Sequence, residues 1–303
     1  MALKKNAAGL NQYCYKKTNK VQKIIQKDWL KEHKYTPDHF PPEFFENIEE
    51  KLTPGKLGYW AYAIDGDGWI STAGKKNKKF TVGITLKDRE PIQELADIYG
   101  TSISRIDHQN KNWKPLYTTQ LYGKRALHFL RFICPYMTEK RKKATQCINR
   151  INPNYHPPKI HMDFKKNSDL ITYHMGMIGG FFDTEGSVGM KVGYQKYKTK
   201  LGDKVSKFRR TWVHFTNTDL RPIRKIKKIL ETWPFNFKPI IYGHQSSDLR
   251  KDGKPHKKAY KLTLPAREEL LFMKMFSPWI LITRKREYAD KFELKNKYIN
   301  DGR

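Results

Sequence analysis

The sequence predicts an α+β fold made of two pseudo-symmetric halves, each with the element order αββαββα. Two internal matches indicate the duplication. ITLKDREPI (Ile84–Ile92) and FTNTDLRPI (Phe215–Ile223) both read apolar-Thr-x-x-Asp-x-x-Pro-Ile. Later in each half, in Ala126–Ala144 and Glu269–Ala289, an apolar helix leads to Pro, an aromatic residue and a basic helix. Two such matches in the same order indicate a duplication and not a chance similarity.

A helix opens each half, over Thr53–Asp65 and Ser168–Asp183. Thr53 is a natural N-cap with Pro54 at the first helical position, and Ser168 takes the N-cap position in the second half. The order then continues with two strands and a second helix, two more strands, and closing apolar and basic helices.

The second helices are predicted over Arg89–Tyr99 and Leu220–Trp233, with Asp88 and Asp219 as N-caps. The strands that follow them are predicted over about Thr101–Ile106, Leu116–Leu121, Pro239–His244 and Ala259–Leu264. The domains are therefore expected to be a basic extension at 1–52, a first half at 53–150, a Pro- and Asn-rich linker at 151–167 and a second half at 168–303. The extension is expected to be a packing arm, a partly disordered leader or an arm that contacts DNA.

The composition indicates a folded chain with a polyanionic partner. Of 303 residues, 60 are Lys or Arg and 30 are Asp or Glu, for a net charge of +30, and 13% are aromatic. So many aromatic residues exclude a disordered polybasic tail, and no apolar run approaches the roughly 20 residues that span a bilayer. Nucleic acid is the usual partner of such a charge; a membrane surface would need a basic amphipathic helix, which we do not find.

Three cysteines show neither a disulfide framework nor a zinc-binding spacing, and no signal peptide begins the chain, so an intracellular protein is expected. Cys134 and Cys147 lie on helical patterns and are expected to be buried. Richness in Lys, Asn, Ile and Tyr is typical of an AT-rich organelle or phage genome.

Alternation along the strands predicts a sheet face that contacts DNA. Val188, Met190 and Val192 alternate with Gly189 and Lys191, which is the period of a half-buried strand. Polar side chains on the exposed face can reach phosphates and base edges, although a merely solvated face has the same pattern. The candidate DNA-binding residues are Lys75, Lys76, Lys78, Thr118, Gln120, Lys191, Gln195, Arg209, Arg210, Lys261 and Thr263.

Two segments end the first helices with acidic residues, WAYAIDGDG (Trp60–Gly68) and IGGFFDTEG (Ile178–Gly186). They resemble the LAGLIDADG motif of the homing endonucleases, and two copies in one chain are similar to the family's single-chain members. The resemblance covers about residues 53–303. It implies an antiparallel β saddle that binds double-stranded DNA, with the two motif helices packed at the centre of a monomer.

Small residues on the motif helices favour that packing. Gly176, Gly179 and Gly180 each cost about 1 kcal/mol in a helix relative to Ala, which close approach of two backbones would offset. Gly58 and Ala61 match the first two. Tyr62 takes the place of Gly180, so the packing there is expected to be asymmetric, or the tyrosine to point aside.

Asp67 and Glu185 are the candidate catalytic and metal-binding residues. Parallel motif helices would bring the two carboxylates together at the helix C-termini, where they repel each other unless a hard divalent cation such as Mg²⁺ is bound. Metal-activated water could then hydrolyse a phosphodiester. Helix-terminal turn residues are the alternative. Asp65 and Asp183 are expected to accept local or cross-helix hydrogen bonds.

The resemblance also implies basic and water-orienting residues near each scissile phosphate. Lys124 and Arg267 occupy matching places at the starts of late helices and are the candidates for transition-state stabilisation, with surface or capping roles as alternatives. Asn217 is the candidate that orients water, whereas its counterpart Leu86 cannot do so.

Taken together, the sequence predicts an intron-encoded or free-standing endodeoxyribonuclease that requires Mg²⁺ and makes a double-strand break at a long, non-palindromic site. The alternatives are an RNA-splicing maturase of the same fold, whose partner would be intron RNA, and a DNA-binding regulator that has lost cleavage.

Overall fold

A computed structural model describes residues 42–73, 79–108, 110, 112–152, 155–157, 167–199, 202–232, 234–245, 253, 255 and 257–292. The chain divides into two compact units, Met1–Glu46 and Asn47–Arg303. A helix, α2 (Pro42–Lys51), lies within the residues expected to form the extension. The sequence also predicts a helix around Val21–His33, which lies outside the described residues.

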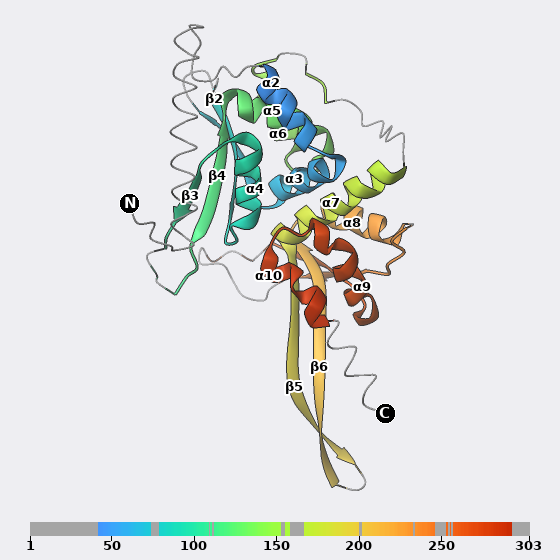
Figure 1. The fold of residues 1–303 in the computed structure, drawn as a ribbon. Helices are drawn as coiled ribbons and strands as arrows, with labels where there is room; N and C mark the ends of the chain where they lie inside the picture. The colour runs from blue at the N-terminus through green and yellow to red at the C-terminus, as the bar shows by residue number, and fades with distance from the viewer. Residues whose placement is uncertain are drawn as a thin grey trace, which may run out of the picture. The chain divides into compact units, whose positions relative to one another are not determined.

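The larger unit has the predicted αββαββα order in each half (Figure 1). The first half comprises α3 (Pro54–Gly66), β1 (Gly68–Ala73), β2 (Lys79–Leu86), α4 (Glu90–Tyr99), β3 (Ile103–Ile106), β4 (Leu116–Tyr122), α5 (Gly123–Ile133), η2 (Cys134–Tyr136) and α6 (Arg141–Asn149). The second half comprises α7 (Asn167–Glu185), β5 (Gly186–Thr199), β6 (Gly202–Asn217), α8 (Leu220–Glu231), β7 (Ile240–His244), β8 (Ala259–Thr263), α9 (Ala266–Phe276), η3 (Ser277–Trp279) and α10 (Thr283–Arg286). The α+β class is therefore confirmed.

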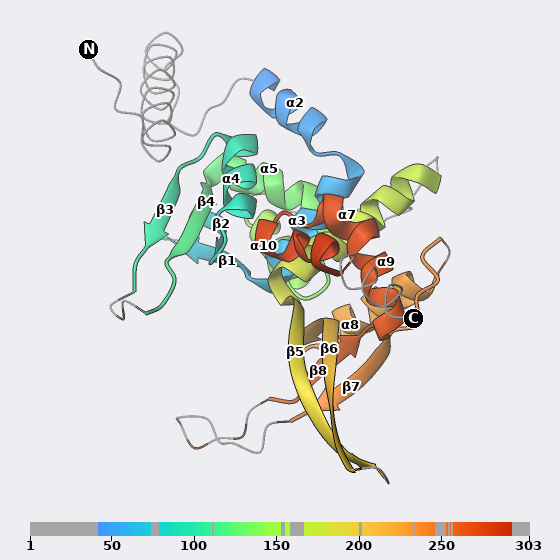
Figure 2. The same cartoon turned by 60° about the horizontal axis from the view of Figure 1, so that its bottom comes forward.

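Each half contains one antiparallel four-stranded sheet, ordered β1-β2-β4-β3 and β5-β6-β8-β7. Helices α4 and α5 pack on the first sheet, and α8 and α9 on the second. Buried side chains such as Val82, Ile84, Val213 and Phe215 point toward these helices. We call the opposite side of each sheet its outer face (Figure 2).

Helices α3 and α7 pack directly against each other, as the motif pair predicts (Figure 1). Glycine allows the approach. A Cβ atom at Gly176 would lie 1.8 Å from the carbonyl oxygen of Gly55, and one at Gly58 would lie 2.3 Å from that of Tyr173. A Cβ at Gly180 would meet the Tyr59 carbonyl oxygen at 2.2 Å. Any larger residue at these positions must therefore push the helices apart.

Two expectations about this packing need correction. Gly179 does not face the other motif helix, because a Cβ there would meet the carbonyl oxygen of Trp279, in η3 of the same half, at 2.2 Å. Tyr62 does not point aside. Its ring is fully buried against Phe181, and the ammonium group of Lys225 lies 5.1 Å from the ring centroid. The packing is therefore asymmetric, which was the other expectation for Tyr62.

The helix ends differ in part from the sequence expectation. Thr53 and Asp219 cap α3 and α8, where their side chains accept hydrogen bonds from backbone N–H groups. Ser168 is not an N-cap, because α7 already begins at Asn167, and α7 continues through Glu185. Asp88 does not cap α4; its carboxylate pairs instead with the guanidinium of Arg284, at 2.7 Å for each of two hydrogen bonds.

Cys134 and Cys147 are buried and free, as expected. In the part of the chain that the structure describes, no helix combines the length and apolarity that crossing a membrane requires.

Candidate active site at the ends of the motif helices

A buried aspartate ties each motif helix to the segment that follows the 3-10 turn of its own half. Asp65 is 2% exposed and accepts hydrogen bonds from the backbone N–H groups of Thr138, Glu139 and Lys140. These bonds position the residue at 140 directly beneath the end of α3.

Asp183 has the same role at the end of α7. It is 3% exposed and accepts from the backbone N–H of Leu281 at 2.7 Å and from that of Ile282 at 3.3 Å. It also accepts from the hydroxyl of Tyr59, on α3, at 2.8 Å. Burial raises the pKa of Asp183 to about 6, although the Lys285 charge and these donors oppose the rise. Asp183 thus accepts the cross-helix hydrogen bond that we predicted, whereas the bonds described for Asp65 are neither local nor cross-helix but come from a distant segment of its own half.

A lysine caps the C-terminal end of each motif helix. The ammonium group of Lys140 donates to the carbonyl oxygens of Ile64, Asp65 and Gly66 at 2.6–2.8 Å. These carbonyls have no partner within a helix, and the helix dipole makes this end negative. A positive charge at this position therefore stabilises the helix end.

Lys285 repeats the arrangement at α7, with its ammonium group donating to the carbonyl oxygens of Phe182, Asp183 and Gly186 at 2.6–2.9 Å. It is 5% exposed, and burial lowers its pKa to about 8. Burial also lowers the pKa of Lys140. The nearby carboxylates oppose both shifts, so the two charges are compensated rather than isolated.

The two predicted catalytic acids lie at these capped ends. Asp67 is the C-cap of α3 and is exposed, whereas Glu185 is the last residue of α7 and is half-buried. Burial and then the charges of Asp67 and Glu139 raise the pKa of Glu185 to about 7. The surrounding protein partly desolvates the Asp67 carboxylate and raises its pKa, but the charges of Lys140 and Lys285 oppose that shift. The structure therefore brings the two acids within electrostatic reach of each other and of both lysines.

This donor set suits a hard divalent cation. A cation between the two carboxylates would offset the repulsion by which Asp67 raises the pKa of Glu185, and oxygen ligands favour Mg²⁺ over softer metals. The carbonyls at the helix ends are already bound by lysines, so Asp67 and Glu185 would supply the protein ligands. Among the described residues, no group of three or more His, Cys, Asp or Glu side chains could hold a metal. Much of the coordination sphere would thus be left to water and phosphate oxygens.

Lys124 and Arg267 make no described hydrogen bond or ion pair with Asp67 or Glu185, so their role at the acid pair stays a prediction. Lys124 is at the N-terminal end of α5, whose opposite end leads into the segment that binds Asp65. An 11-residue helix is about 16 Å long, which separates the two ends. Arg267 similarly begins α9, where its exposed guanidinium lies 3.9 Å from Glu268.

Sequence reasoning did not identify Lys140 and Lys285 as the residues that cap the motif helices. Both follow the Pro-aromatic pair of the second internal match, so a signal was present in the repeat. It was not decisive because the spacing from the proline differs between the halves, and because basic residues are abundant on both sides of each lysine.

Asn217 is engaged in hydrogen bonds within the protein. It is 8% exposed, and its side-chain oxygen accepts from the backbone N–H of Asp219 at 2.6 Å. Burial raises the pKa of Glu139, and a hydrogen bond from the Asn217 side chain opposes that rise. Both ends of the amide are therefore engaged within the protein. Asn217 thus links the two halves, and its water-orienting role stays a prediction.

The candidate DNA-binding residues are distributed unevenly. Lys191, Gln195 and Arg210 are exposed on the outer face of β5 and β6, and Lys261 and Thr263 are half-buried on the outer face of β8. The backbone of Arg209 pairs with that of Val192, and its side chain lies outside what the structure describes. Lys75, Lys76 and Lys78 lie outside the described residues.

In the first half, Gln120 lies half-buried on the outer face, next to Tyr122, whose hydroxyl donates to it. Thr118 is only 6% exposed, and its hydroxyl donates to the Ile84 carbonyl oxygen and accepts from Thr85. A buried hydroxyl already used within the sheet is a poor base contact, so we leave Thr118 out of the proposed interface.

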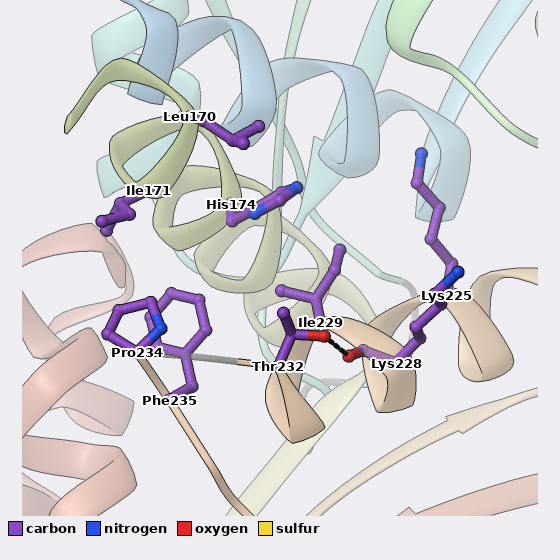
Figure 3. A pocket seen from close by; sticks show the side chains of 9 residues that line it. All are labelled: Leu170, Ile171, His174, Lys225, Lys228, Ile229, Thr232, Pro234 and Phe235. Atoms are coloured by element: carbon purple, nitrogen blue, oxygen red, sulfur yellow. Dashed lines mark hydrogen bonds between the residues drawn. The ribbon is translucent and has the colours of Figure 1, made fainter. Parts of the chain in front are cut away.

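A separate pocket of about 500 Å³ lies between α7 and α8 (Figure 3). Figure 3 shows His174, Lys225 and Phe235 around it, along with mainly apolar side chains. Burial lowers the pKa of His174 to about 4, so the imidazole is neutral near neutral pH. The acid pair does not contribute to the lining, and we assign no catalytic chemistry to this pocket.

No family model and no curated protein matches the chain. Similar solved structures include the meganuclease I-SmaMI bound to uncleavable DNA with a TTCT central four. It has a TM-score of 0.45 and 14% identity, over 83% of this chain and 92% of that one. The same meganuclease with a TTGT central four has a TM-score of 0.41 and 12% identity, over 80% and 90%.

The homing endonuclease I-CvuI in complex with its target, in the presence of 2 mM Ca, has a TM-score of 0.26 and 16% identity, over 41% of this chain and 78% of that one. At these TM-scores we take the function from the residues of this chain and not from those proteins.

Proposed function

We propose that this protein is a site-specific endodeoxyribonuclease that makes a divalent-metal-dependent double-strand break in DNA. One observation carries the proposal. Two carboxylates, Asp67 and Glu185, lie at the ends of two pseudo-symmetric helices, each of which is capped by a lysine. A pair of acids related by a duplicated fold suits a duplex, whose two strands are themselves related by symmetry.

The residues of the site have separate roles in this proposal. Asp67 and Glu185 would hold Mg²⁺, which supplies an activated water and stabilises the charge on the leaving oxygen when it is bound. Lys140 and Lys285 each already make three hydrogen bonds, which is the full donor capacity of an ammonium group. They would therefore act through their charge and by holding the helix ends, not as donors to the phosphate.

Affinity would come from the basic outer faces of the sheets. Exposed Lys191 and Arg210 and half-buried Lys261 supply charge for phosphates, while Gln195 is suited to base edges. Because the two halves differ at these positions, the preferred site would be long and non-palindromic. Both acids belong to one chain, so a monomer would suffice for cleavage of both strands.

The test is selection of cleaved targets from a random DNA library with Mg²⁺, followed by cleavage of the selected duplex with and without EDTA. We expect discrete double-strand breaks that EDTA abolishes. Specific binding without cleavage at any Mg²⁺ concentration would overturn the nuclease and favour a regulator. Stimulation of intron splicing in the absence of DNA cleavage would instead favour a maturase.

A further inference from the structure

The hairpins that begin the two sheets differ greatly in length. β1 has 6 residues and β5 has 14, while β2 has 8 and β6 has 16. At about 3.3 Å per residue, β5 is about 46 Å long and β1 about 20 Å. Figures 1 and 2 show β5 and β6 running well beyond the other strands of their sheet.

The extra length of the second hairpin lies outside any core. In the first half, β4 pairs with β2 from Thr81 to Leu86 and so supports most of that strand. In the second half, β8 pairs with β6 only from His214 to Asn217. Residues 191–199 and 202–210 pair only with each other among the described residues, and we call them the distal ribbon.

Burial ends where the distal ribbon begins. Val213 is fully buried and Thr211 is 7% exposed, whereas Val192, Tyr194 and Val205 are 44%, 69% and 59% exposed. An isolated two-stranded ribbon is only marginally stable in water. Packing within the described residues therefore does not account for the length of the distal ribbon. Exposed apolar and aromatic side chains on it gain most from a partner that covers them.

The charge of the ribbon identifies the class of that partner. Residues 191–210 contain eight basic residues and one acidic residue. Lys191, Arg210 and polar Gln195 are exposed on the outer face, and Lys196 and Lys198 are exposed on the other face, so the ribbon is basic on both faces. A two-stranded antiparallel ribbon is also one of the shapes that the major groove of DNA admits. Duplex DNA would neutralise the charge and cover the exposed side chains at once.

We infer that the distal ribbon reads a flank of the DNA target for which the first half has no counterpart. The cut would then lie off centre within the bound site. The difference of about 26 Å between β5 and β1 corresponds to roughly six to eight base pairs at about 3.4 Å each. This inference rests on the proposed nuclease, because it extends the same DNA site in one direction.

The test is a hydroxyl-radical footprint of the selected target with the Glu185→Gln variant, which is expected to bind without cutting. We expect protection to extend about six to eight base pairs further on one side of the cleavage position than on the other. A triple variant, Lys191→Gln with Lys196→Gln and Lys198→Gln, should lose protection on the longer side alone. It should also reduce the slope of log Kd against log salt concentration by about 2 to 3.

A matched control removes the same charge from exposed helix positions, as Lys142→Gln, Lys143→Gln and Lys228→Gln. It should leave the footprint unchanged. A footprint symmetric about the cut, or equal weakening on both sides in the ribbon variant, would overturn the inference and leave the nuclease proposal intact. Failure of the unsubstituted protein to cut any selected DNA would overturn the proposed function itself.

Discussion

Both halves tie the end of the motif helix with a buried aspartate and a capping lysine, whereas the contacts that flank this centre differ between them. On one flank, Arg284 of the second half makes a bidentate pair with Asp88 of the first. On the other flank, the matching residues are Glu139 and Asp219, both acidic, and Asn217 links the halves instead.

The difference follows from what each region must satisfy. At the centre, two helices share one interface, and four carbonyl groups at each helix end need donors in either half. A buried aspartate and a capping lysine therefore occur at the end of both motif helices. The flanking contacts involve different residues in the two halves. Leu86 in the first half matches Asn217 in the second, so one pair of side chains cannot serve both flanks. The capping contacts at the helix ends are thus repeated, whereas the flanking contacts are not.

The largest expected effect comes from breaking the acid pair. Asp67→Asn and Glu185→Gln should each reduce double-strand cleavage by about 10³-fold, because either change removes a charge that a bound cation requires. Specific binding should change little, since basic strands supply the affinity. Single-turnover cleavage and gel-shift titration measure the two quantities.

Asp290→Asn, which removes an exposed carboxylate elsewhere, is the control and should cut normally. Full double-strand cleavage by either active-site variant would contradict the assignment. Residual nicking by one variant and not by the other would show that the two acids are not equivalent.

Next in size is the loss of a lysine cap. Lys285→Met should lower the free energy of unfolding by about 3 kcal/mol, because it leaves buried Asp183 and three carbonyl oxygens without their cation. Lys140→Met should cost less, since Lys140 and its neighbours are less buried. Urea unfolding measures both, with Lys142→Met as an exposed control. A larger loss for Lys140→Met would reverse the comparison.

The asymmetry of the helix interface gives a smaller effect. Gly180→Ala should destabilise the fold by about 1–3 kcal/mol, because its Cβ would lie 2.2 Å from the Tyr59 carbonyl oxygen. Tyr62→Phe, at the matching position of the first half, should cost less than about 1 kcal/mol, because it removes only the hydroxyl that contacts Thr138. Thermal unfolding compares the two, and a stabilising Gly180→Ala would contradict the close approach.

The smallest expected effect concerns His174, whose counterpart in the first half is Lys56 in an ion pair with Glu94 at 3.2 Å. Burial lowers the pKa of His174 to about 4. A base with a lowered folded pKa stabilises the fold above its unfolded pKa of about 6.5, and that stability is lost as pH falls toward 4.

Between pH 7 and pH 5, the wild type should therefore lose more stability than His174→Gln, by less than about 1 kcal/mol per pH unit. Urea unfolding at the two pH values measures the difference. Identical pH dependence in the two proteins would show that the imidazole is not shielded from water. Lys56→Gln serves as the control at the matching position and should not alter the slope.

Local patterns were sufficient for much of the architecture and for the acids. Thr53, Asp219 and the alternating strands are decided by neighbours in sequence, so their elements lie close to the predicted bounds. The duplicated motif indicated Asp67 and Glu185 and the small faces at Gly58, Gly176 and Gly180. These features depend on residue type and periodicity, which a single sequence contains.

Only the tertiary structure decided which lysines lie near the two acids and which side chains link the halves. Lys140 and Lys285 are selected by the hydrogen bonds of Asp65 and Asp183 to distant backbone, not by spacing along the chain. Asp88 pairs with Arg284, nearly two hundred residues away, instead of capping α4. The sequence by itself determined the elements, because local propensity and period specify them, and its resemblance to the LAGLIDADG motif predicted the acid pair. The lysines, the flanking links and the burial of Thr118 depend on how the elements pack together, which no local pattern encodes.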